Sequence, residues 1–267
     1  MDIINAIILG IVEGITEFLP ISSTGHLIIF NQFFSFSEQF QNTFDVVIQL
    51  GAIMSVVFYF WKRIYPFQTT ISPEQKNVIY DLWKKTIVAV IPAIILGGLF
   101  GSKIQQYLFN PATVAIMLFI GGIALIIIEN QKRKENINST IEITYKVALY
   151  IGLIQTLSML PGTSRSAATI IGALLLGSNR VVAAEFSFFL AIPTMFAASV
   201  YSLYKHGVAF QNNELLLLII GFVTSFIVAF FVIKMFMKFI STHNFKSFGY
   251  YRIVLAIAVI LFLYVIK

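Results

Sequence analysis

EGITEFLPISSTGHL (residues 13–27) interrupts an apolar amino-terminal segment with two carboxylates, a proline, two serines, a threonine and a histidine. A proline removes a backbone hydrogen-bond donor and disfavours the helical conformation of the residue before it, so a helix tends to end at Leu19. A serine that follows can cap a new helix with its side-chain oxygen. The stretch therefore predicts two short helices joined by a tight turn.

A second stretch of the same kind, MLPGTSRS (residues 159–166), breaks another apolar segment. A single offset aligns the two stretches and superposes Leu19 on Leu160, Pro20 on Pro161 and Ser23 on Ser164. Half-helices of about 15 residues reach only about 23 Å, which is short of a hydrocarbon core of about 30 Å. We therefore expect residues 3–34 and 147–177 to form re-entrant hairpins, each of which returns to the face that it entered.

The composition is typical of a membrane protein. Of the 267 residues, 58% are hydrophobic and only 11% are charged, against roughly a quarter charged in an average soluble domain. The absence of cysteine excludes disulfides and thiolate chemistry. The basic residues are not interleaved with aromatic residues, so the net charge of +6 does not indicate nucleic-acid binding. No cleavable signal peptide is expected, because the amino terminus lacks a basic start.

Six apolar runs are long enough to cross a bilayer as helices, at residues 44–60, 86–103, 112–129, 184–204, 214–236 and 249–266. Three runs follow each hairpin, and because three is odd the second half enters the membrane upside down. The expected fold is a single all-α polytopic membrane domain, residues 1–267, in which repeats 1–130 and 147–267 have inverted topology. This arrangement places a site near the midplane, between the halves.

Basic residues cluster in three of the predicted loops, with Arg180 on the same side. They are Lys62, Arg63, Lys76, Lys84 and Lys85, then Lys132, Arg133, Lys134 and Lys146, then Lys234, Lys238, Lys246 and Arg252. By the positive-inside rule these loops are cytoplasmic. Both termini and the mouth of the first hairpin are then expected on the outer face.

Two acids share one helix face in the first hairpin. Glu13 and Glu17 occupy positions i and i+4, one helical turn apart. Two carboxylates in a low dielectric cannot both ionise cheaply unless a cation joins them. A hard cation, Mg²⁺ or Ca²⁺, bound through carboxylates and phosphate oxygens, fits the pair, so Glu13 and Glu17 are predicted metal ligands. The alternative is a solvated pair near the membrane surface.

Hydroxyls and an imidazole follow the first turn. Ser22, Ser23 and Thr24 come first, and His26 lies three residues after Ser23. A hydroxyl beside an imidazole can be a nucleophile with its base, and a histidine can itself act as nucleophile or general acid. The simpler interpretations are helix capping for the hydroxyls and packing for the histidine. We favour Ser23 assisted by His26, and leave attack by His26 or by water open.

The second hairpin supplies groups for an anion. PGTSRSAAT (residues 161–169) presents unpaired backbone N–H groups at a helix start. Arg165 adds a planar fork that matches phosphate oxygens. It either forms a structural salt bridge with Glu13 or Glu17, or binds a phosphate that a metal also holds. The predicted substrate-binding residues are Thr24, Ser164, Arg165, Ser166 and Thr169, with supporting roles for Asp45, Gln49, Glu185 and Ser187.

Taken together, the ExxxE pair, LPISSTGH and PGTSRSAAT resemble the paired signatures of the undecaprenyl-diphosphate phosphatase family associated with bacitracin resistance. FDVVIQLG and AEFSF extend the resemblance over essentially the whole chain. The resemblance implies a bacterial plasma-membrane enzyme that hydrolyses undecaprenyl diphosphate to undecaprenyl phosphate and inorganic phosphate, recycling the lipid carrier for cell-wall precursors. It also implies a divalent metal, a site open to the outer face and a homodimer. Glu17, Ser23, His26 and Arg165 would then be the catalytic residues.

The rival hypothesis is a transporter or flippase for an anionic polyprenyl phosphate lipid. Inverted repeats with broken helices at the midplane are a signature of transporters, and a fold does not settle a function. An acid pair beside a histidine and hydroxyls favours bond breaking, because binding a moving anion needs only cations and helix ends.

Overall fold

The computed structural model describes residues 2–34, 36–206 and 214–266, and its regular elements are helices. The α-helices are α1 (Asp2–Thr16), α2 (Ser23–Phe30), α3 (Glu38–Tyr59), α4 (Trp61–Ile64), α5 (Pro73–Leu108), α6 (Pro111–Asn130), α7 (Tyr145–Gln155), α8 (Arg165–Leu175), α9 (Arg180–His206), α10 (Glu214–Ile240) and α11 (Lys246–Ile266). Short 3₁₀ helices are η1 (Asn31–Phe33), η2 (Thr140–Glu142) and η3 (Thr156–Met159). The predicted all-α fold class is confirmed.

Helices form over every predicted span. Five of them, α3, α5, α6, α9 and α10, are long and apolar enough to cross a membrane by length and composition. The sixth run forms α11. The helices extend beyond the apolar runs because polar residues start them: Ser72 and Gln75 form a capping box with Pro73 in the first turn, so α5 begins well before its apolar part and spans 36 residues.

The two interrupted segments form helix–turn–helix units, as their prolines predict. In the first unit Ser22 caps α2, its Oγ accepting a hydrogen bond from the Gly25 N–H at 3.4 Å. In the second, Ser164 caps α8 in the same way, accepting from the Ala167 N–H at 3.2 Å. Each turn therefore ends in a serine whose side chain satisfies one of the free donors of the next helix.

The structure corrects the alignment of the two turns by one residue. Ser22 and Ser164 are the described non-glycine residues with positive φ, at 73° and 69°. The two caps are therefore equivalent, and Ser23 corresponds to Arg165 rather than to Ser164. The reason is local: one residue separates the proline from the cap in the first turn, whereas two separate them in the second.

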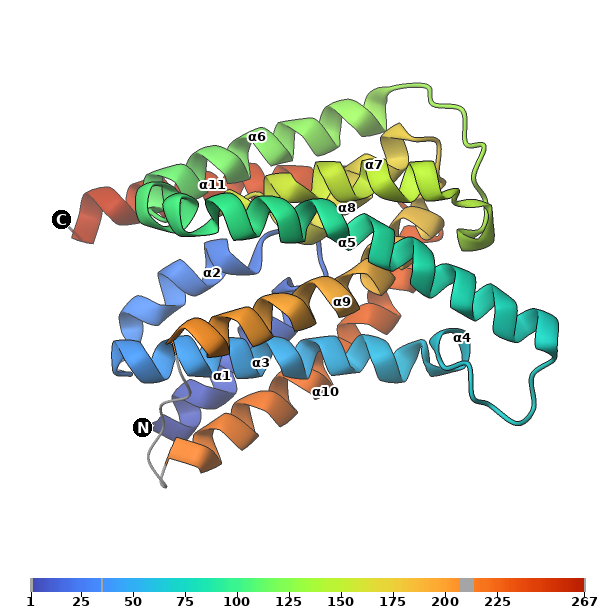
Figure 1. Ribbon diagram of the computed structural model, residues 1–267. Coiled ribbons are helices and arrows are strands. Elements are labelled where there is room, and N and C mark those ends of the chain that lie inside the picture. The colour runs from blue at the N-terminus through green and yellow to red at the C-terminus, as the bar shows by residue number, and fades with distance from the viewer. Residues whose placement is uncertain (1, 35, 207–213, 267) are drawn as a thin grey trace.

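The helices pack in related pairs. Helix α1 lies along α10, α7 lies along α5, and α6 lies along α11. Small residues allow the close approach, since a Cβ added at Gly152 of α7 would lie 2.1 Å from the Ala89 carbonyl oxygen of α5. In Figure 1 the turns of both hairpins lie in the middle of the molecule, and α1 begins at the end where α11 finishes.

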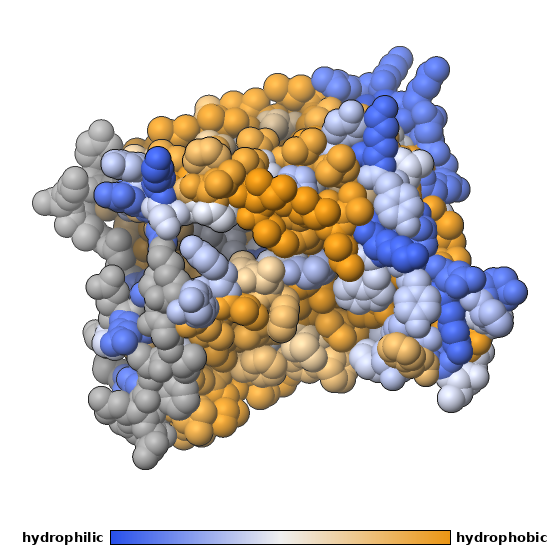
Figure 2. Space-filling model, in the orientation of Figure 1, coloured by the Kyte–Doolittle hydropathy of each residue, from blue (hydrophilic) through white to orange (hydrophobic). Residues whose placement is uncertain are grey.

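A hydrophobic band covers the middle of the face that Figure 2 shows. Figure 2 shows apolar side chains over the middle, with hydrophilic residues gathered at the end where Figure 1 places the α4–α5 and α6–α7 connections. The basic loops of the sequence thus lie together at one end. Arg252 does not belong with them: its side chain is 0% exposed and packs inside the helical bundle. Counting it as a loop cation was wrong, because its place on α11 turns it towards α6 and both turns.

Candidate active site

A pocket of about 240 Å³ lies where the two turns meet. Its lining comes from both hairpins and from α3 and α9: Glu17, Ser22, Ser23, Thr24, Gln49, Ser158, Gly162, Ser164, Arg165, Thr194, Met195 and Ala198. Both α2 and α8 begin at this pocket, so two helix amino termini, each carrying a partial positive charge, face the same space. Such an arrangement attracts an anion.

Two larger pockets, of about 420 and 350 Å³, open elsewhere on the molecule. The first has a mostly apolar lining around Lys103. The second is lined by charged residues, and two of its cations are already paired, Arg63 with Glu185 and Lys85 with Asp81. Neither lies where the turns of the two hairpins meet, and neither is lined by the amino termini of both α2 and α8, so the smaller pocket is the candidate site.

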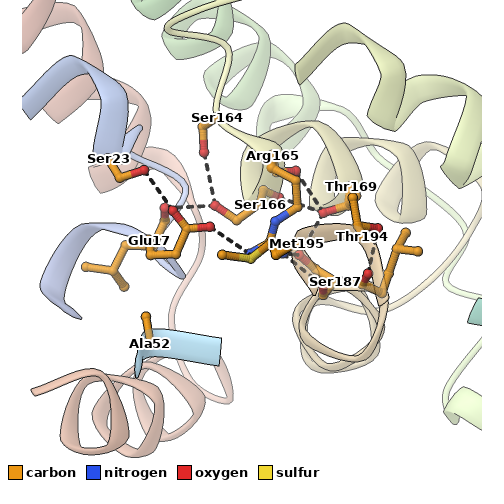
Figure 3. A network of polar contacts seen from close by, with 12 residues as sticks. Glu17, Ser23, Ala52, Ser164, Arg165, Ser166, Thr169, Ser187, Thr194 and Met195 are labelled. Carbon is orange, nitrogen blue, oxygen red and sulfur yellow. Dashed lines mark hydrogen bonds and ion pairs between the residues drawn. The ribbon is translucent and has the colours of Figure 1, made fainter. Parts of the chain in front are cut away.

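Glu17 stands at the centre of the polar contacts in this pocket (Figure 3). Its Oε1 accepts from Arg165 Nη2 at 3.2 Å, and its Oε2 accepts from Ser23 Oγ at 2.8 Å. The acid of the first hairpin thus meets the arginine of the second, and the structural salt bridge considered from the sequence is formed. The base nearest to the Ser23 hydroxyl is this carboxylate.

Arg165 is held in place on its far side by α9. Its Nη1 donates to the Ser187 carbonyl oxygen at 3.0 Å, and its Nη2 lies 3.3 Å from Met195 Sδ. Its guanidinium also stands over the Phe18 ring, 5.6 Å from the centroid. The buried Nε has no partner among the described residues, so the guanidinium keeps one donor free. The backbone of Ser187 is thus one of the contacts that hold the Arg165 guanidinium.

Backbone donors at the two helix starts are also free. Within the described ranges nothing accepts from the N–H groups of Ser164, Arg165 and Ser166, or from those of Ser23 and Thr24. The first N–H groups of a helix have no partner within that helix. Because such groups lie on both sides of one pocket, they can donate to an anion placed between them.

His26 is placed away from the Ser23 hydroxyl. Its Nδ1 lies 2.8 Å from the Ser22 carbonyl oxygen, and its Nε2 lies 2.7 Å from Tyr251 Oη. The two rings stack at 5.6 Å, and His26 does not line the pocket. Both ring nitrogens are thus engaged with other groups, so the pairing of Ser23 with His26 inferred from their spacing is not the one observed.

Three further predicted residues lie behind the pocket lining. Ser166 and Thr169 are 0% exposed. Ser166 Oγ donates to the Leu19 carbonyl oxygen at 2.9 Å and so ties one turn to the other, while Thr169 Oγ1 lies 2.7 Å from Ser187 Oγ. Glu13 is 2% exposed, one turn before Glu17 on α1. Thr24 and Ser164 line the pocket directly.

The oxygen donors at the pocket suit a hard cation. Glu17, Ser23, Thr24 and Gln49 offer carboxylate, hydroxyl and amide oxygens, the ligand types that Mg²⁺ and Ca²⁺ prefer. Among the described residues no group of three or more His, Asp or Glu side chains could hold a metal alone. The donor set therefore fits a cation that takes part of its coordination from a phosphate ligand, as Mg²⁺ usually does.

Sequence reasoning missed Tyr251 and Arg252 of α11. One signal was available for Arg252, since a charge inside an apolar run of spanning length is a candidate functional residue. Nothing in the sequence pointed to Tyr251, because its role depends on which helix packs against His26. The same holds for Met195, whose sulfur reaches Arg165 only through the packing of α8 on α9.

Comparison with known proteins shows which family the chain resembles over most of its length. Residues 6–258 match the family model described as bacitracin resistance protein BacA. An undecaprenyl-diphosphatase of Enterococcus faecalis is 50% identical, with 98% of this chain and 97% of the relative covered. An undecaprenyl-diphosphatase of Lachnoclostridium phytofermentans is 51% identical, with 96% and 94% covered. The chain therefore belongs to the bacitracin resistance protein BacA family.

Proposed function

We propose that this protein is an integral membrane phosphatase that hydrolyses undecaprenyl diphosphate to undecaprenyl phosphate and inorganic phosphate. The observation that carries the proposal is the convergence of two helix amino termini, Arg165 and the Glu17–Ser23 pair on one pocket. The names of the relatives support the same substrate. No comparable observation favours the transport alternative.

The pocket supplies a site for the diphosphate. Phosphoryl transfer needs positioning and stabilisation of charge more than covalent chemistry from the protein. The free N–H groups at the starts of α2 and α8 face the charge, and Arg165 adds its fork. As the phosphate enters, its oxygens replace Glu17 as the partner of Arg165, which frees the carboxylate to take up a proton. The polyprenyl chain stays in lipid along apolar helix surfaces.

Ser23 then acts as the nucleophile, with Glu17 as its base. The Ser23 Oγ proton moves along the 2.8 Å hydrogen bond to Glu17 Oε2 while Oγ bonds to the terminal phosphorus. The bond from that phosphorus to the bridging oxygen breaks, and undecaprenyl phosphate leaves. Water next attacks the phosphoserine and the Oγ–phosphorus bond breaks. Glu17 returns its proton to Oγ, both protons of the water stay with the phosphate, and inorganic phosphate leaves. His26 holds the turn through the Ser22 carbonyl oxygen.

A divalent cation belongs to the proposal. Glu17 would hold Mg²⁺ or Ca²⁺, with Glu13, buried one turn earlier, adding its negative charge from behind, and the cation would neutralise charge on the diphosphate.

The proposed architecture and orientation follow from the packing and the charge. The related helix pairs support six spans and two re-entrant hairpins in an inverted repeat. The basic end lies in the cytoplasm, so both termini and the pocket mouth face the outside of the bacterial plasma membrane. A homodimer remains a prediction.

Phosphate release from a polyprenyl diphosphate by the purified protein tests the function. We expect release with Mg²⁺ or Ca²⁺ from the wild-type protein, and its loss in Glu17→Gln. Glu135→Gln, in an exposed loop, is the matched control and should behave as the wild type. A wild-type protein that is folded and supplied with cation, yet releases no phosphate, would overturn the proposal.

A further inference from the structure

Arg252 of α11 is a buried cation that the proposed reaction does not use. Its side chain is 0% exposed. Within the described part of the chain it pairs with no carboxylate, since the ion pairs there involve other residues. An unpaired charge is costly inside a membrane protein and is a candidate for function by default. The groups that surround the Arg252 guanidinium therefore indicate its role.

Backbone carbonyls from three segments surround the guanidinium. Nη1 donates to the Pro20 oxygen at 3.3 Å, and Nη2 donates to the Gly162 and Thr163 oxygens at 3.1 and 2.9 Å. On α6, Nη2 reaches the Met117 oxygen at 3.1 Å, and Nε reaches the Leu118 oxygen at 3.3 Å. One side chain thus binds the turns of both hairpins and fastens them to α6.

Peptide geometry connects these contacts to the pocket. In a planar trans peptide the C=O and the N–H point in opposite directions. Arg252 holds the Thr163 C=O, so the N–H of the same peptide, which belongs to Ser164, is directed away from Arg252. Ser164 lines the pocket, and no described residue accepts from this N–H. The donor available to a phosphate is therefore fixed from behind by the arginine.

Arg252 also supports the strained part of each turn. Ser22 and Ser164 have φ values of 73° and 69°. A non-glycine residue in a sparsely populated conformation costs about 1–3 kcal/mol and persists only where its surroundings hold it. The carbonyls that Arg252 binds lie one or two residues before these serines.

We propose that Arg252 is a positioning residue for the phosphoryl site, because it clamps both turns and so fixes the free Ser164 N–H, a backbone donor that receives the diphosphate. The inference rests on the proposed function for its kinetic consequence. Its structural part, the clamping of two turns by one side chain, stands on the contacts alone.

A glycine offers a way to move the guanidinium without removing the charge. A Cβ added at Gly121 of α6 would lie 2.3 Å from Arg252 Nη2, at the far end of a flexible side chain. Gly121→Ala therefore displaces the guanidinium while the helices can stay in place. Gly98→Ala is the matched control, because a Cβ at Gly98 meets no atom within 4 Å. Arg252→Lys keeps the positive charge but replaces the planar guanidinium, and with it the hydrogen bonds that its several donors make at once.

The experiment measures kcat and KM, and also amide hydrogen exchange, for the wild type and these three variants. In Gly121→Ala and Arg252→Lys we expect kcat to fall about 10- to 100-fold, with KM within about threefold of the wild type. We also expect faster exchange in peptides covering 17–24 and 158–166, with exchange in α10 unchanged. Gly98→Ala should match the wild type in every measurement.

Two results would overturn the proposal. One is a Gly121→Ala protein whose kcat and turn exchange equal those of Gly98→Ala. The other is failure of both Gly121→Ala and Arg252→Lys to fold while Gly98→Ala folds, because Arg252 would then serve the whole fold. A wild-type protein without phosphate release would instead refute the proposed function, and the exchange data would still decide the clamp.

Discussion

Arg165 Nη2 lies 3.2 Å from Glu17 Oε1, although the two residues are 148 positions apart and belong to different hairpins. The two side chains are only 11% and 6% exposed. The contact joins the anion-binding end of α8 to the acid that accepts from Ser23. Folding therefore creates the site, because neither half of the chain contains both groups.

Removing the arginine should damage both activity and stability. We expect Arg165→Ala to lower phosphate release by about 100- to 1000-fold, because no guanidinium then stabilises the charge on the phosphate being transferred. It also leaves Glu17 buried without its partner, which costs about 3–5 kcal/mol when a buried pair is broken. Release must therefore be measured per folded protein, with exposed Lys134→Ala as the control. Near-normal release from Arg165→Ala would refute the assignment of Arg165 to phosphate binding.

Ser23 should be indispensable for turnover. We expect Ser23→Ala to lower phosphate release by about 10³-fold or more, because it removes the nucleophile that Glu17 activates. Ser241→Ala, at an exposed serine after α10, should have no effect. Both variants should fold as the wild type does, judged by size-exclusion chromatography in detergent. Full activity in Ser23→Ala would exclude Ser23 from the chemistry.

The chemical nature of a trapped phosphoenzyme distinguishes the three nucleophiles. With a substrate labelled in the terminal phosphate, we expect label on the protein that survives acid, because a phosphoserine ester is stable to acid. A phosphohistidine is labile to acid, so label lost on acid treatment would assign the attack to His26. Absence of label at every time in rapid-quench samples would assign it to water.

Removal of divalent cations should stop the reaction reversibly. We expect a chelator to abolish phosphate release and added Mg²⁺ or Ca²⁺ to restore it, because the diphosphate charge needs a counter-ion. Glu13→Gln should raise the cation concentration needed for half-maximal release, whereas Glu135→Gln should leave it unchanged. Undiminished release in chelator would contradict the predicted metal dependence.

The contact between α7 and α5 should depend on one glycine. Gly152→Ala places a methyl group 2.1 Å from the backbone oxygen of Ala89, which no side-chain movement can relieve. We expect a loss of about 1–3 kcal/mol or more, as for other overpacked sites. Thermal unfolding in detergent measures the loss, and Gly98→Ala provides the reference. Equal unfolding temperatures would contradict the packing described for this pair.

The orientation in the membrane is open to a simple test. A reporter fused after residue 267 should be active outside the cytoplasm, because the basic end of the molecule is expected inside. A reporter in the loop around Lys132 should show the opposite location. A cytoplasmic carboxyl terminus would overturn the proposed topology.

Much of the fold follows from the sequence because its causes are local. The lengths of the apolar runs predict the spanning helices, and Pro20 and Pro161 predict where the two other segments break. The chemistry of the pocket is also visible in the types of residue near the breaks: Glu17 and Ser23 in one, Arg165 in the other. These features depend on a few neighbouring residues.

The partners within the site depended on packing. In the tertiary structure Ser23 forms a hydrogen bond with Glu17, and His26 forms one with Tyr251. Ser22 is the counterpart of Ser164, and Arg252 lies inside the helical bundle rather than in a loop. The spacing of residues along one helix could not predict these pairings. They depend on two turns that differ in length by one residue, and on helices that come from distant parts of the chain. The sequence alone determined which groups were available, and the packing of α8, α9 and α11 decided which of them meet.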